Sequence, residues 1–221
     1  IYLQNNDSTF TKKFYNHAVP NNINLGHPSM IEGSSIADVD NDGDLDILIL
    51  RNGSEKNTLL LHNGDENNDG LYDVTFEKVG LDLSNNELFD ESITSSWGDY
   101  DNDGYLDLFI GNYKSPNFLY NNNGDGTFEK ILDGDVVNDG GLEDIYCISQ
   151  SSSWGDYDND GYLDLFVANY CNDPVTLDVD VSSFLYHNNG DGTFEKILDV
   201  GVANDNGLSR GASWADYDND G

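Results

Sequence analysis

The stretch DYDNDGYLD at residues 99–107 decides the fold, because the same pattern of aspartates recurs at nearly regular intervals along the chain. It recurs as DVDNDGDLD at 38–46 and as DYDNDGYLD at 156–164, and its first six letters return at 216–221. The four first aspartates (38, 99, 156 and 216) are 61, 57 and 60 residues apart. Such a nearly fixed period is typical of repeat proteins, so we expect an array of similar units.

A second sequence motif alternates with the first and reads LYNNNGDGTF at 119–128 and LYHNNGDGTF at 185–194. Its Asn-Gly-Asp-Gly turn predicts a β-hairpin, because glycine supplies the positive φ that tight turns need. A short apolar run overlaps or follows the end of each acidic motif, and these runs lie at 45–50, 106–110 and 163–168. These runs are too short for helices, so they predict strands that are buried on both faces.

Each unit of about sixty residues therefore holds about four strands, and a repeated set of four antiparallel strands is the blade of a β-propeller. We predict an all-β chain made of a single propeller repeat region over residues 1–221. Its approximate units are 1–58, 59–117, 118–183 and a truncated 184–221. They amount to about three and a half four-stranded antiparallel blades, which form an incomplete ring.

The acidic motif is followed by an apolar strand and alternates with the Asn-x-Gly-Asp-Gly-Thr-Phe motif. This arrangement resembles the FG-GAP/VCBS repeat family. The resemblance covers essentially the whole chain. It implies a calcium-binding propeller similar to that of integrin α subunits, and family members usually close with about seven blades. We therefore expect a fragment of a longer protein or, alternatively, self-association through exposed blade edges.

The charge of the chain narrows the classes of partner. Asp and Glu number 42 against 9 Lys and Arg, which gives a formal net charge of −33. Such a surface repels nucleic acids and anionic membranes and attracts divalent cations. Because no apolar stretch approaches the length of a transmembrane helix, we expect neither nucleic acid binding nor membrane insertion.

The repeated aspartates are candidate calcium ligands, because Ca²⁺ takes six to eight oxygen ligands and tolerates irregular geometry. Positions 1, 3, 5 and 9 of each loop offer carboxylates, position 6 is a glycine that permits a sharp turn, and position 7 offers its backbone carbonyl. The candidate ligands are Asp38, Asp40, Asp42, Asp44 and Asp46 in the first loop; Asp99, Asp101, Asp103, Tyr105 and Asp107 in the second; Asp156, Asp158, Asp160, Tyr162 and Asp164 in the third; and Asp216, Asp218 and Asp220 in the fourth.

An insertion in the second repeat reads DENNDGLYD at 65–73 and has the same spacing. Its candidate ligands are Asp65, Asn67, Asp69, Leu71 and Asp73. The alternative is an acidic surface hairpin without metal.

Other metals and other calcium motifs fit the loops less well. Mg²⁺ prefers octahedral, largely hydrated sites, and zinc is disfavoured because the loops contain no His or Cys. EF-hands need an acid at position 12, where this chain has Ile49, Ile110 and Val167. The four histidines share no metal spacing, so we expect them in surface or turn positions: His17, His27, His62 and His187.

Two sets of residues outside the loops have competing interpretations. Trp97, Trp154 and Trp214 each stand two residues before a loop, and we favour an inter-blade core over a row of sugar-stacking platforms. Cys147 and Cys171 fall nearly opposite each other if the third loop joins antiparallel strands. This placement favours a disulfide over two free thiols, and it suits an oxidising compartment.

No catalytic motif stands out, so we expect a non-enzymatic protein. The leading hypothesis is a calcium-stabilised module, extracellular or on the cell surface, that binds a protein or glycan. The alternatives are part of a polysaccharide-processing enzyme and a structural subunit of a cell-surface or filament assembly. The sequons at Asn6 and Asn52 would carry glycans in a eukaryotic host.

Overall fold

The computed structural model describes residues 2–4, 10–12, 31–51, 56–64, 76–79, 91–113, 115–139, 147–171, 183–198, 201 and 209–215. These residues form three four-stranded antiparallel sheets whose strand order follows the chain. The first sheet contains β3 (Ile31–Ala37), β4 (Asp46–Arg51), β5 (Thr58–His62) and β6 (Phe76–Val79). The second contains β7 (Ser92–Gly98), β8 (Asp107–Asn112), β9 (Phe118–Asn122) and β10 (Phe128–Lys130). The third contains β11 (Cys147–Gly155), β12 (Asp164–Cys171), β13 (Phe184–Asn188) and β14 (Phe194–Ile197).

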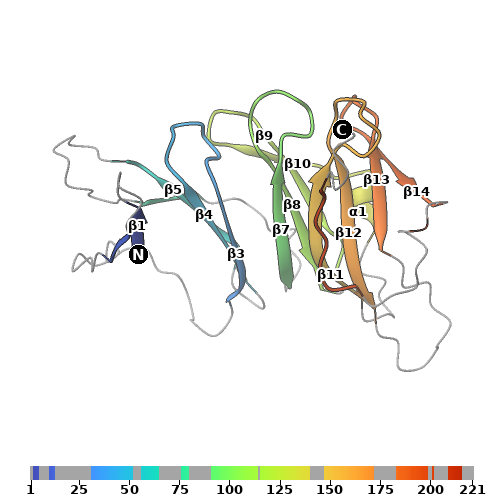
Figure 1. Ribbon diagram of the computed structural model, residues 1–221, viewed down its shortest axis with the longest axis horizontal. Coiled ribbons are helices and arrows are strands. Elements are labelled where there is room, and N and C mark those ends of the chain that lie inside the picture. Colours follow the sequence, from blue (N-terminus) through green and yellow to red (C-terminus); the bar gives the residue numbers. More distant parts are fainter. Residues whose placement is uncertain are drawn as a thin grey trace.

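The three sheets stand side by side as blades, with the first strands β3, β7 and β11 next to one another (Figure 1). A separate pair of strands, β1 (Tyr2–Gln4) and β2 (Phe10–Lys12), and one short helix, α1 (Asp135–Asn138), complete the described elements. Within the described residues the sheets do not close into a ring. The prediction of an all-β chain with four-stranded antiparallel blades in an incomplete propeller is therefore confirmed. No helix among these residues has the length and apolar character needed to cross a membrane.

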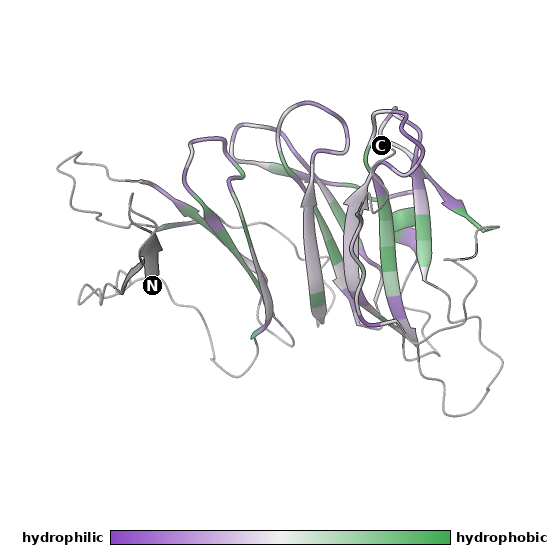
Figure 2. Cartoon of the chain, in the orientation of Figure 1, coloured by the Kyte–Doolittle hydropathy of each residue, from purple (hydrophilic) through white to green (hydrophobic). Residues whose placement is uncertain are grey.

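The repeated acidic motifs form loops that connect neighbouring strands of a sheet. Each acidic loop joins the first two strands of a blade, and in the second blade the ladder ends at the pair Gly98–Asp107. All three loops lie along the same edge of the molecule (Figure 1). The strands that follow them are buried, as the apolar runs predict: Leu108, Phe109 and Ile110 of β8 are fully buried. Figure 2 shows the contrast between these hydrophobic strands and the hydrophilic loops at their ends.

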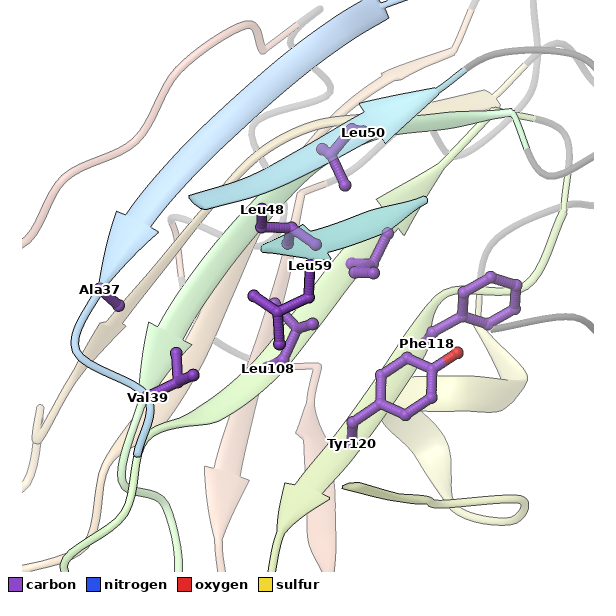
Figure 3. Close-up of a cluster of buried hydrophobic side chains, with 9 residues drawn as sticks. Ala37, Val39, Leu48, Leu50, Leu59, Leu108, Phe118 and Tyr120 are labelled. Carbon is purple, nitrogen blue, oxygen red and sulfur yellow. The ribbon is translucent and has the colours of Figure 1, made fainter. Parts of the chain in front are cut away.

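Two apolar clusters fill the spaces between neighbouring blades. Leu48 and Leu59 of the first blade pack with Leu108 of the second, as Figure 3 shows. A second cluster joins residues of the second and third blades, among them Phe109 and Leu165. Because each cluster draws side chains from two blades, a single blade does not bury its own apolar surface and needs its neighbour.

The tryptophans lie at these inter-blade contacts. The indole N–H of Trp97 donates to Ser35 Oγ of the preceding blade (2.9 Å), and Trp154 stacks on Tyr100 at 6.1 Å between ring centroids. A Cβ added at Gly98 would lie 2.7 Å from the Trp154 ring, so the glycine makes room for the next blade. The predicted inter-blade position is therefore confirmed for Trp97 and Trp154.

The register also places the two cysteines. Cys147 and Cys171 are direct cross-strand partners of β11 and β12, at the end of the hairpin that lies farthest from the third loop. Their side chains lie outside the described part of the structure, so the bridge itself stays a prediction. The sequons at Asn6 and Asn52 likewise fall outside the described residues.

Candidate metal centre

The three complete loops share one pattern of hydrogen bonds. In the second loop the backbone amides of Asp103 and Gly104 each donate to Asp99, one to each carboxylate oxygen, at 3.0 Å. The amide of Tyr105 donates to Asp103 Oδ1 at 2.9 Å. The matching bonds in the first and third loops measure 2.8 to 3.1 Å. These bonds turn the carboxylates at positions 1 and 5 toward the inside of each loop.

The turn itself depends on positions 4 and 6. Asn102 has φ 61° and Gly104 has φ 93°, both in the left-handed region that asparagine and glycine tolerate best. The asparagine side chain also reaches the neighbouring blade. Asn41 Nδ2 donates to the carbonyl of Gly104, and Asn102 Nδ2 donates to the carbonyl of Gly161, each at 2.9 Å.

The aspartate at position 9 is buried in each of the three loops that the structure describes. Asp107 is fully buried, and its two oxygens accept the backbone amides of Tyr100 (3.0 Å) and Asn122 (2.8 Å). Burial raises the pKa of Asp107 to about 7, although these two hydrogen bonds act in the opposite direction. Burial also raises the pKa of the equivalent Asp46 and Asp164. The ionised form of this carboxylate is therefore destabilised in the folded chain.

The side chains converge on one point in each loop. Oxygens within 4.8 Å of one another come from positions 1, 3 and 5 in the first and third loops and from positions 1, 3 and 9 in the second: Asp38, Asp40 and Asp42; Asp156, Asp158 and Asp160; Asp99, Asp101 and Asp107. Two full charges 4.8 Å apart repel by ~3 kcal/mol at an effective dielectric constant of about 20. Such sets of hard oxygens at close range fit a divalent cation that prefers oxygen, such as Ca²⁺.

Two predicted loops cannot be placed. The inserted loop at 65–73 and the fourth loop at 216–221 lie outside the described residues. The carbonyls at position 7 belong to Asp44, Tyr105 and Tyr162, whose backbone amides donate hydrogen bonds to the carboxylate at position 5.

The structure also brings to the loops a residue that the sequence analysis missed. It is the residue before the last one of the third strand in the second and third blades: Asn121 in β9 and His187 in β13. Asn121 Nδ2 donates to Asp101 Oδ2 at 2.6 Å, and His187 Nδ1 lies 3.2 Å from Asp164 Oδ1. The four histidines were expected in surface or turn positions, and His187 lies instead in a strand, β13, with its partly buried ring beside the third loop. Pairing of β12 with β13 makes the contact, which spacing along the chain does not reveal.

Comparison with known proteins adds three findings. The model of the FG-GAP-like repeat matches residues 99–167 and 156–221, which together make up more than half of the chain. Cartilage acidic protein 1 of Xenopus tropicalis is 33% identical over 69 residues, which are 31% of this chain and 10% of that protein.

A solved structure shows a lectin of Agrocybe aegerita with specific recognition of non-reducing terminal N-acetylglucosamine. It is 21% identical with a TM-score of 0.46, and the match covers 78% of this chain and 40% of the lectin. The chain thus spans less than half the length of either protein. The repeated aspartate loops, the blades and the family match agree, and the chain belongs to the family of FG-GAP-like repeat proteins.

Proposed function

We propose that this chain is a calcium-stabilised propeller segment that acts outside the cell as a binding or adhesion module for a protein or a glycan. The observation that carries the calcium part is the repeated convergence of carboxylate oxygens within 4.8 Å at one blade edge. Backbone amides donate to these oxygens. They are neutral, so they order the loops but do not remove the repulsion.

Calcium would act as a structural ion in this proposal. The loops connect the first two strands of each blade, so a cation that holds a loop closed also holds the ladder that starts at its ends. At about 1 mM calcium and dissociation constants of about 0.01–0.1 mM, each site contributes ~1–3 kcal/mol. Three such sites together rival the stability of an ordinary domain.

The test is thermal unfolding by calorimetry, with calcium and after dialysis against EDTA. We expect calcium to raise the melting temperature by more than about 5 °C, because ~1 kcal/mol shifts a chain of this length by about 2–4 °C. Mg²⁺ at the same concentration is the control, and it should have a much smaller effect. A melting temperature that does not respond to calcium would refute the structural role.

The extracellular assignment has two supports. The relative is named after cartilage, a tissue in which extracellular matrix predominates, and we extend that setting to this chain. The cross-strand partners Cys147 and Cys171 are placed for a disulfide, which an oxidising compartment would preserve.

Binding of a protein or glycan is proposed from the family and from the position of the three described loops along one edge of the blades (Figure 1). A glycan array and a set of matrix proteins would be probed with the chain in calcium and in EDTA. Binding that requires calcium supports the proposal. Cleavage of a polysaccharide on the same array would instead identify an enzyme.

A further inference from the structure

The residue before the last one of the third strand differs chemically among the three blades. In β9 it is Asn121, an amide that donates to Asp101 of its own loop. In β5 it is Leu61, and in β13 it is a histidine, His187. A histidine brings a nitrogen ligand to a loop that otherwise offers oxygen alone.

The His187 ring stands between two carboxylates of the third loop. Its Nδ1 lies 3.2 Å from Asp164 Oδ1 and 3.4 Å from Asp158 Oδ2, and the three ligand atoms lie within 4.8 Å of one another. One ring nitrogen carries at most one proton, so a single hydrogen bond, shared at best, faces two carboxylate oxygens. A metal ion bound by all three atoms satisfies both carboxylates and the nitrogen together.

Asp164 and His187 are held in place by contacts outside the proposed site. Asp164 is fully buried, and its oxygens accept the amides of Tyr157 and Asn188 at 3.0 and 2.9 Å. The ring of His187 meets the Tyr157 ring edge to face, at 6.1 Å between centroids. A site whose donors are fixed before the ion arrives loses less entropy on binding.

The first loop does not repeat this arrangement. His62 Nδ1 lies 3.5 Å from Asp44 Oδ1, the side chain at position 7, and makes no hydrogen bond. Among the described residues, His187 is the one histidine whose ring nitrogen converges with carboxylates of two loop positions. His62 therefore serves as a comparison outside this arrangement, and Asn121, at the position of His187, is the reference without an imidazole.

We propose that His187, Asp158 and Asp164 form a mixed nitrogen–oxygen site that binds a divalent ion of the first transition row, such as Zn²⁺ or Co²⁺. Imidazole favours these ions, whereas an all-oxygen loop favours Ca²⁺. The inference rests on the proposal that the loops bind cations. It adds that the third loop discriminates among metals differently from the second.

The test uses Co²⁺ as a coloured probe and Tb³⁺ as a probe of oxygen sites, both on the full chain. Titration with Co²⁺ should produce a visible absorption band that Zn²⁺ abolishes. His187→Asn should weaken Co²⁺ binding by at least about tenfold and keep Tb³⁺ binding at the loops. Asparagine occupies this position in the second blade, so the variant should fold, and its circular dichroism spectrum checks that it does.

Two further variants sharpen the result. His62→Asn is the control, because it removes the other described histidine that lies beside a loop, and it should leave the Co²⁺ band unchanged. Asn121→His should create a second band of similar intensity. A His187→Asn variant that binds Co²⁺ as tightly as the parent, while Tb³⁺ still occupies the loops, would overturn the inference and leave calcium binding intact. Failure of the parent to bind either probe would overturn both proposals.

Discussion

Replacement of Asp107 by asparagine separates the cost of a buried charge from the benefit of calcium. The side chain is fully buried, and it accepts one amide on each oxygen, from Tyr100 and Asn122. Asn keeps the size and one acceptor oxygen but removes the charge. The second oxygen becomes an NH₂ group that faces an amide donor.

The expected free energies follow from these contacts. A rise in pKa from 3.8 to about 7 corresponds to roughly 4 kcal/mol of destabilisation by the ionised group at pH 8. The lost acceptor costs ~1–3 kcal/mol. Without calcium, Asp107→Asn should therefore be more stable than the parent by ~1–3 kcal/mol. With calcium the variant loses the contribution of one site, also ~1–3 kcal/mol, so the advantage should disappear.

Urea unfolding at pH 8, in EDTA and in about 1 mM calcium, measures both quantities. The control is Asp125→Asn in the exposed hairpin of the same blade, where Asp125 accepts the amide and hydroxyl of Thr127 at 3.0 and 2.5 Å. That variant should be destabilised equally in both buffers, because Asp125 lies outside the loop. The reasoning is refuted if Asp107→Asn is less stable than the parent in EDTA or keeps the full response to calcium.

Three further outcomes are expected. In EDTA the free energy of unfolding, measured by urea titration, should fall as pH rises from about 4 to about 7. The buried position-9 carboxylates have raised pKa values in the folded chain, so their stabilising contribution is lost as they ionise. In calcium the free energy of unfolding should instead rise over this pH range, because calcium binding needs the ionised carboxylates. Gly98→Ala should cost ~1–3 kcal/mol in thermal unfolding, because its Cβ would lie 2.7 Å from the Trp154 ring, whereas Gly211→Ala, with open space around it, should be neutral. Thiol titration of the denatured, unreduced chain should find Cys147 and Cys171 bridged, and reduction should cost ~3 kcal/mol; two free thiols would disprove the bridge.

The local features of the fold could be predicted from the sequence because they depend on residues close together in the chain. The Asn-Gly-Asp-Gly text specifies its own hairpin, and the buried run after each loop specifies the strand. The loop aspartates converge because amides two to five residues away bind them, as Gly104 binds Asp99. Such contacts need no knowledge of how the blades pack.

Contacts between strands and between blades could not be predicted in the same way. Asn122 Nδ2 donates to the carbonyl of Val39, 83 residues earlier, and this bond exists only once two blades are side by side. His187 reaches Asp164 across 23 residues through the pairing of β12 and β13. The Leu-Tyr-His-Asn motif at 185–188 contained a signal, because the register of one hairpin, once assumed, would have placed the histidine beside the loop.

The links between loops have a consequence for how such chains change length over generations. Asn102 gives a hydrogen bond to the following loop, and Gly104 of the same loop receives one from Asn41 of the preceding loop. Each repeat therefore carries both halves of its joint, in a fixed orientation. Duplication or excision of one whole repeat would recreate the same joint at the new boundary, so a gene of this kind can gain or lose blades singly without the invention of a new interface.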